Sequence, residues 1–225
     1  MSMHSSPDFR TFYVFLCLLL AFSVALTAES ASRKVTVGNL ISAGDKTSVC
    51  FSDRFLTTVQ TEAAIPTEKR LRVTRLGERN ELEHVNFTIM NGNEAFELTT
   101  GERENLKRWL TRGGFLLASA GCSAESWSAS FRAEMIKMFG AGALKVVGRE
   151  HRLFRTLFPI TNFSLSHGGT ARFEGIYIDG RLVVLFSPEG LNDTAHTQGC
   201  CCCGGNEVKQ AEEIVANTLV YALTE

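Results

Sequence analysis

The sequence predicts an α/β protein, a three-layer sandwich around a mostly parallel β-sheet with a β-hairpin near the C-terminus. Short runs of β-branched and apolar residues alternate with longer stretches that repeat apolar residues at helical spacing. This alternation is typical of chains that build a parallel sheet covered by helices. Phe115–Ala120 is apolar or small at every position, as buried parallel strands are. Asp179-Gly180 lies between two apolar runs and predicts a two-residue hairpin turn.

The first part of the folded chain contains three predicted strands and one helix. The strands are expected at residues 34–41, 71–73 and 85–90. The helix is expected from Asp53 to about Ala64, because Phe55 and Val59 recur on one face and Pro66 follows.

Two helices are predicted on either side of the strand at 115–120. The pattern Thr99-x-x-Glu102 has the form of a capping box and predicts a helix start. This helix should end at Gly113, since glycine readily takes the left-handed conformation that closes a helix. A second helix is expected from Glu125 to Phe139, with its aromatic and methionine side chains facing the core.

The last part of the chain is expected to hold the hairpin and a final helix. Strands are predicted at residues 144–147, 171–178 and 181–187. Asn206 is expected to cap the final helix, whose apolar stripe begins at Val208.

The N-terminus predicts export. Residues 12–28 are almost wholly apolar and follow a short polar stretch that contains Arg10, which is the pattern of an export signal. The segment is short for a membrane span, which needs about 20 apolar residues. We therefore expect residues 1–30 to be removed, with an N-terminal anchor as the alternative, and residues 34–225 to form one domain. The protein should be periplasmic or extracellular.

The charge balance argues against a nucleic-acid partner. The chain has 23 Lys and Arg against 24 Asp and Glu, so it lacks the basic excess of nucleic-acid-binding domains. The membrane is expected as a partner only through an uncleaved N-terminal segment.

Six cysteines remain after the predicted signal: Cys50, Cys122, Cys200, Cys201, Cys202 and Cys203. An even number of cysteines in an oxidising compartment predicts disulfides. Each group follows a predicted strand, and the carboxyl ends of parallel strands share one edge of a sheet. We therefore expect all six cysteines to meet at that edge.

Four motifs resemble an exported family of unknown activity, domain of unknown function 4159. They are residues 113–123 (GGFLLASAGCS), Phe131-Arg132-x-Glu134-Met135, His151-x-Leu153-Phe154 and residues 174–181 (EGIYIDGR). The resemblance implies a fold similar to class I glutamine amidotransferases and other flavodoxin-like domains. It implies no reaction, because none is established for the family.

Amidotransferase chemistry is not expected from the residues themselves. Cys122 stands where those enzymes carry a nucleophile on a strand-to-helix turn, and Pro188-Glu189 matches part of their late His-Pro-Glu motif. Ser187 stands where the histidine should be, and serine cannot accept a thiol proton at neutral pH.

Cys122 has three interpretations, which we rank as disulfide first, metal ligand second and nucleophile third. A disulfide needs only geometry and an oxidising compartment. Zinc or copper(I) could be held by cysteines from the six named above, with His196 as a further ligand. A nucleophilic Cys122 would use His196 as its base, with Glu189 as a further catalytic residue.

The sequence as a whole favours a non-catalytic binding or assembly module of the cell envelope. Its partner would be another envelope protein or a small ligand, and its cysteine-rich edge would be stapled by disulfides or hold a soft metal. The alternative is a thiol-dependent hydrolase or a thiol–disulfide redox enzyme that uses Cys122.

Overall fold

The computed structural model describes residues 34–42, 51–192 and 205–225. These residues belong to one compact unit, Lys34–Glu225. The predicted export segment lies outside the described residues, as do Cys50, His196 and Cys200–Cys203. Within the described part of the chain, no helix is long and apolar enough to cross a membrane.

A seven-stranded sheet in the order β2-β1-β3-β4-β7-β6-β5 forms the middle layer. Its strands are β1 (Val37–Ile41), β2 (Arg72–Arg75), β3 (Phe87–Gly92), β4 (Phe115–Ala120), β5 (Lys145–Val146), β6 (Glu174–Ile178) and β7 (Arg181–Ser187). Neighbours from β2 to β7 pair in parallel, whereas β6 and β5 are antiparallel additions at one side. The parallel strands alone run in the order 2-1-3-4-5, one of the common doubly wound arrangements.

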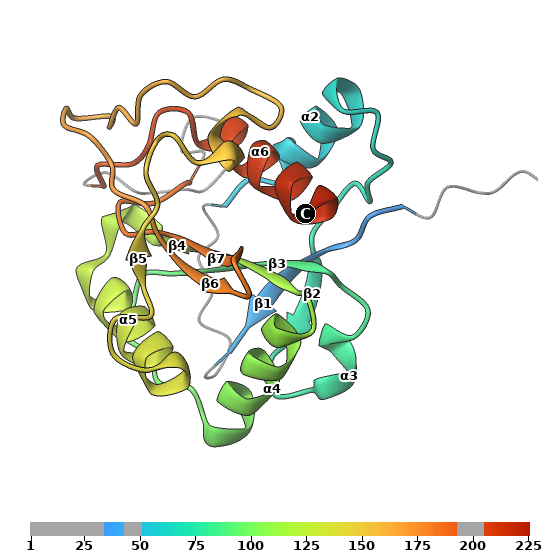
Figure 1. Ribbon diagram of the computed structural model, residues 1–225, viewed down its shortest axis with the longest axis vertical. Helices are drawn as coiled ribbons and strands as arrows, with labels where there is room; N and C mark the ends of the chain where they lie inside the picture. The colour runs from blue at the N-terminus through green and yellow to red at the C-terminus, as the bar shows by residue number, and fades with distance from the viewer. Residues whose placement is uncertain (1–33, 43–50, 193–204) are drawn as a thin grey trace, which may run out of the picture. The chain divides into compact units, whose positions relative to one another are not determined.

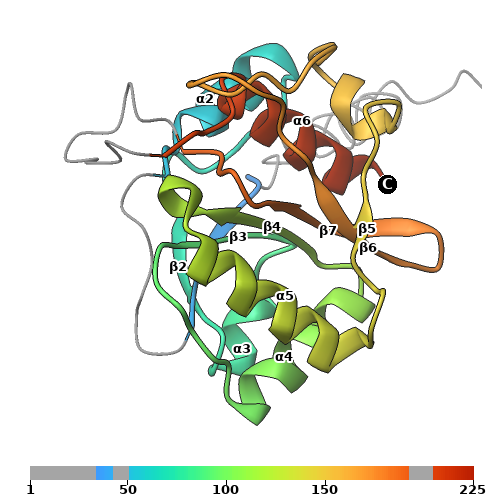
Figure 2. The same cartoon turned by 90° about the vertical axis from the view of Figure 1, so that its left-hand side faces the viewer.

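Helices cover both faces of the sheet, which confirms the predicted α/β class. They are α2 (Arg54–Glu62), α3 (Arg79–Leu82), α4 (Thr100–Thr111), α5 (Glu125–Phe139) and α6 (Ala211–Thr224). Helices α2 and α6 lie on one face, and α3, α4 and α5 lie on the other (Figure 1, Figure 2).

The two faces of β4 explain why this strand is apolar throughout. Successive side chains of a strand point to opposite faces. Phe115 and Leu117 belong to the core under α2 and α6, while Leu116 and Ala118 belong to the core under α4 and α5. A strand with helices on both sides therefore has no solvent-facing position where a polar residue would be favoured.

Two local signals in the sequence act as predicted. The side chain of Thr99 accepts a hydrogen bond from the Glu102 amide (3.2 Å), and the Glu102 carboxylate accepts one from the Thr99 amide (2.8 Å). This reciprocal pair is the predicted capping box of α4. Asp179 and Gly180 both have positive φ, 50° and 82°, which matches the turn type that connects closely paired strands such as β6 and β7.

The predicted cap of the final helix is wrong. Helix α6 begins at Ala211, and its N-cap is Gln210. The side-chain oxygen of Asn206 instead accepts a hydrogen bond from the His167 amide (2.7 Å). A tertiary contact thus takes the acceptor that a local helix cap would have used. The four-residue helix α3 was not predicted, because one turn is too short to show an apolar period.

Candidate functional site

The carboxyl edge of the sheet brings three separate segments together. Strands β4 and β7 are parallel neighbours and end side by side, with Ser119 paired to Ser187. The turn after β4 (residues 121–124) and the segment after β7 (residues 188–192) therefore leave the sheet at the same place. Residues 205–208, which precede α6, pack against both. The structure places Cys122 and Glu189 at this edge.

The turn after β4 has an uncommon backbone. Cys122 and Ser123 both have positive φ, 54° and 55°, a conformation that costs non-glycine residues of order 1 kcal/mol or more. Hydrogen bonds from two other segments hold it. The Ser123 hydroxyl donates to the Glu189 carbonyl (2.7 Å) and accepts from the Asn206 amide (2.8 Å). The strained turn is thus held by hydrogen bonds of the Ser123 side chain to two other segments of the chain.

Two glycines let the neighbouring backbones approach this turn. Gly190 has φ of 103°, and a Cβ atom there would lie 2.4 Å from the Ala120 carbonyl oxygen. A Cβ atom at Gly205 would lie 2.8 Å from the Cα atom of Cys122. Neither position can hold a side chain without moving backbone, so both segments pack directly on the Cys122 turn.

Glu207 is a site residue that sequence reasoning missed. Its side chain is only 4% exposed, and Oε1 accepts hydrogen bonds from the Cys122 amide (2.9 Å) and the Asn192 side-chain amide (2.8 Å). Burial raises the pKa of Glu207, although both hydrogen bonds oppose the shift. No local motif marks this residue, because its partners are 85 and 15 positions away in the sequence.

Glu189, the predicted catalytic carboxylate, is partly buried at the same edge. Its side chain accepts a hydrogen bond from the Arg172 amide (3.4 Å). Burial raises its pKa, and the Arg172 amide and the Arg132 charge partly offset this effect. Glu189 is joined to the Cys122 turn through its backbone carbonyl, which accepts the hydrogen bond from the Ser123 hydroxyl.

Ser187 and His167 both lie near the Cys122 turn. Ser187 is fully buried, and its hydroxyl accepts a hydrogen bond from the Gly190 amide (3.1 Å). The amide of His167 donates to Asn206, which places the His167 backbone close to the site, while the residue itself is exposed. His196, the preferred base, lies outside the described residues.

His151 lies at the other end of the sheet from Cys122. It caps a short helix, Arg152–Arg155, with Nδ1 accepting a hydrogen bond from the Leu153 amide (3.2 Å). Its ring packs against Tyr177 and Tyr221. Tyr177 lies in β6 and pairs with Leu182 near the start of β7. Burial lowers the pKa of His151, with the Arg152 charge adding to the effect. His151 is therefore a packing residue and not a partner for Cys122.

Cys122 is engaged in an interaction and is not free. It is the only cysteine among the described residues, so each predicted disulfide depends on a cysteine outside them and stays a prediction. The same part of the chain contains no cluster of three His, Cys, Asp or Glu residues that could hold a metal ion. The predicted zinc or copper(I) site depends on cysteines outside the described residues and stays a prediction.

The residues that flank the other cysteines converge on this edge. Phe51, which directly follows Cys50, lines a small hollow together with Leu191 and Ala211. Leu191 is close to the start of the segment that carries the four-cysteine run, and Gly205 follows its end. The residue after Cys50 and the residues on both sides of the four-cysteine segment therefore lie at this edge.

The comparison with protein families agrees with the motifs found in the sequence. A family model described as "Domain of unknown function (DUF4159)" matches residues 45–223. The chain belongs to this family. The match includes the Cys122 turn, residues 188–192 and residues 205–208. No curated protein matches the chain, and the DUF4159 description names no activity, so the function has to be argued from the geometry.

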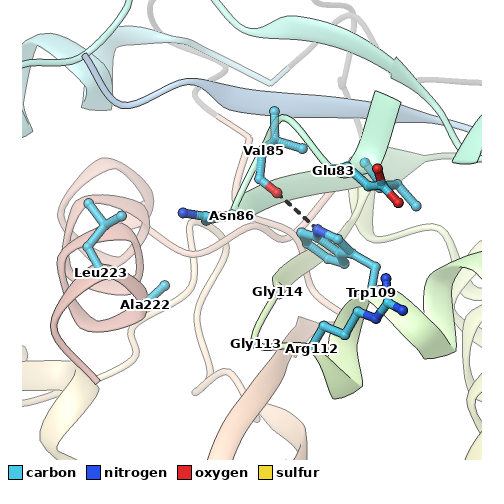
Figure 3. A pocket seen from close by; sticks show the side chains of 10 residues that line it. Glu83, Val85, Asn86, Trp109, Arg112, Gly113, Gly114, Ala222 and Leu223 are labelled. Carbon is cyan, nitrogen blue, oxygen red and sulfur yellow. Dashed lines mark hydrogen bonds between the residues drawn. The ribbon is translucent and has the colours of Figure 1, made fainter. Parts of the chain in front are cut away.

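A pocket lies near the start of β3 and β4, and Figure 3 shows the side chains that line it. Its volume is about 430 Å³, and its wall contains Trp109, the backbone of Gly113 and Gly114, and the end of α6 at Leu223. The indole nitrogen of Trp109 donates to the Val85 carbonyl (2.9 Å), as Figure 3 shows. In open α/β sheets ligands bind beyond the carboxyl ends of the strands. This pocket lies at the amino ends of β3 and β4, so the Cys122 edge is the stronger candidate in this DUF4159 protein.

The close contact between Gly114 and Trp109 in the wall of this pocket leads to a prediction about stability. Gly114→Ala would place a Cβ atom 2.4 Å from the Trp109 ring, so the ring must move and lose its bond to Val85. We expect a loss of about 1–3 kcal/mol in the free energy of unfolding, measured by urea titration, together with a changed Trp fluorescence spectrum. Gly77→Ala is the control, because nothing lies within 4 Å of a Cβ there. Equal stability of the two variants would contradict the prediction.

Proposed function

We propose that this protein is an exported binding or assembly module whose carboxyl edge is stapled by a disulfide from Cys122 to the four-cysteine segment. The position of Gly205 carries the proposal. Gly205 packs on the Cα atom of Cys122, and Cys203 is only two residues before it. Consecutive Cα atoms are about 3.8 Å apart, and disulfide-bonded residues have Cα atoms about 4.4–6.8 Å apart. A bridge between Cys122 and the end of the run therefore needs no rearrangement of the described chain.

Cys50 is the natural partner for a second bridge at the same edge. Phe51 shares a hollow with Leu191 and Ala211, and this places the chain next to Cys50 beside the segments that surround Cys122. A third bridge would then use the remaining cysteines of the run.

The chemistry of the edge favours binding over catalysis. Cys122 is engaged with a partner, and its amide is held by the carboxyl of Glu207. Ser187 is used inside a turn, and His151 lies at the other end of the sheet. A loop held by bridges loses little entropy when it binds, which is how rigid loops gain affinity. The partner would be a small ligand or another protein of the envelope, and the apolar segment at residues 12–28 supports export.

A thiol–disulfide redox enzyme is the second candidate, and one observation favours it. Cys122 sits in a left-handed conformation on a turn between β4 and α5. Strained strand-to-helix turns of this kind expose nucleophiles in several enzyme classes. Strained or exposed disulfides are also more easily reduced. A thiol-dependent hydrolase would in addition need a base such as His196.

The experiment that tests the proposal is the intact mass of the exported protein, with thiol alkylation before and after reduction. We expect loss of about the first 30 residues, as export signals are removed, no alkylation before reduction and six alkylated cysteines after it. Free thiols with a bound ion would instead make the edge a metal site for zinc or copper(I). A single thiol that reacts much faster than the others would favour the enzyme.

A further inference from the structure

Two buried oxygen atoms at the carboxyl edge have no hydrogen-bond partner among the described residues. They are Oε2 of Glu207 and Oδ1 of Asn192, and no group of the described residues donates to either of them. Both residues are only 4% exposed, so bulk water does not satisfy these atoms. Leaving a buried polar atom without a partner costs about 1–3 kcal/mol. Two such atoms in neighbouring side chains therefore need an explanation.

The two atoms belong to side chains that are already joined. The Asn192 amide nitrogen donates to Oε1 of Glu207 (2.8 Å). An ionised carboxylate can only accept hydrogen bonds, whereas a protonated one also carries an O–H donor. A proton on Oε2 could be donated to Oδ1 of Asn192, and the two side chains would then share two hydrogen bonds. One proton would satisfy both atoms.

We propose that Glu207 keeps its proton at pH values where an ordinary glutamate has lost it, and that the neutral acid–amide pair with Asn192 latches residues 205–208 onto the Cys122 turn. We call this pair the Glu207–Asn192 latch. The latch depends on hydrogen bonds and burial alone, so it does not rest on the proposed disulfide.

The latch connects the segments that form the edge. Oε1 of Glu207 accepts from the Cys122 amide (2.9 Å), and the Glu207 carbonyl accepts from the Ser166 amide (2.9 Å). The next residue, Val208, donates its amide to the Gly190 carbonyl (3.1 Å). Ionisation of Glu207 would leave a buried negative charge that has two hydrogen-bond donors and no cation among the described residues, and burying such a charge is costly. Residues 205–208 relieve this cost by opening toward water.

The direction of the pH effect follows from burial. The ionisable groups that neighbouring segments bring to this edge are Glu189 with Arg172, His167 and Lys209. Burial raises the pKa of Glu207 above 4.5, and none of these charges is among the causes of the shift. The closed form therefore holds one proton more than the open form between 4.5 and the raised pKa. The latch is fully stable below 4.5, weakens as the pH rises through this window and then levels off.

Hydrogen exchange of the Asn206 and Val208 amides tests the latch, because these amides are bonded only while the segment is closed. We compare the wild type with Glu207→Gln between pH 4.5 and 8, with a chelator present and intrinsic exchange rates subtracted. Glutamine reproduces the neutral acid, since it can accept from Cys122 and donate to Oδ1 of Asn192. The wild type should lose protection by about tenfold per pH unit in its titration window, as expected for one proton. Glu207→Gln should stay constant over the same range.

The matched control is Glu189→Gln, which removes the other carboxyl of the edge whose pKa burial raises, and which should keep the wild-type slope. Parallel profiles for the wild type and Glu207→Gln would overturn the proposal. If Glu207→Gln does not fold, infrared spectra of the Glu189→Gln protein supply the second test. A protonated carboxyl band should persist above pH ~5, where ordinary glutamates are ionised, and vanish as protection is lost. Absence of that band would also overturn it.

Discussion

Replacing Gly190 with alanine is expected to destabilise the folded protein by about 3 kcal/mol or more. Two independent costs add at this position. The backbone has φ of 103°, which an L side chain rarely adopts, and the new Cβ atom would lie 2.4 Å from the Ala120 carbonyl oxygen. The obstacle is backbone of β4 and cannot rotate away. The segment after β7 must therefore lift off the Cys122 turn.

Urea unfolding followed by circular dichroism measures this loss. Gly101→Ala is the matched control, since this glycine lies in α4 with nothing within 4 Å of a Cβ. It should be stabilised by up to about 1 kcal/mol, because alanine is the better helix former. A Gly190→Ala protein as stable as the wild type would mean that β4 and the segment after β7 do not pack as described.

Replacing Cys122 with serine is expected to cost about 2–4 kcal/mol of stability in the oxidised protein, because the disulfide that we propose at Cys122 would be lost. Serine is nearly the same size and can take the same left-handed backbone, because its neighbour Ser123 already does. The substitution therefore removes the sulfur and little else. The amide of residue 122 can still donate to Glu207.

Urea unfolding with and without a reductant separates the bridge from the packing. Reduced wild type should fall toward the stability of Cys122→Ser, and the reductant should affect the variant less. Together with Gly190→Ala, this experiment distinguishes the contribution of the crosslink from that of the backbone contact at the same edge. A variant as stable as the oxidised wild type would rule out a stabilising bridge at Cys122.

Strands and helices with strong local signals were predicted to the residue. Strand β4, helix α5 and strand β7 have the expected bounds, because each combines a clear apolar pattern with a glycine or turn at its end. The capping box at Thr99 and the turn at Asp179-Gly180 depend on neighbours within three residues. Such signals survive folding because tertiary contacts do not compete for the same groups.

The final helix shows where local signals fail. Asn206 has the side chain of a helix cap, but the amide of His167 takes its oxygen and α6 starts at Ala211. The competing donor is 39 positions away, and no local pattern shows it.

By itself, the sequence determined the α/β class, the order of most elements and the position of Cys122 after a buried strand, because periodicity and turn chemistry are local. It also predicted that all six cysteines would meet at one edge, since parallel strands share their carboxyl ends. The structure describes only Cys122 among them, so that part stays a prediction. Only the tertiary structure decided that Glu207 and Asn192 lie buried at that edge, and that Gly190 and Gly205 pack on the Cys122 turn. A buried carboxyl is defined by long-range neighbours and by lost water, and neither can be read from the residues beside it.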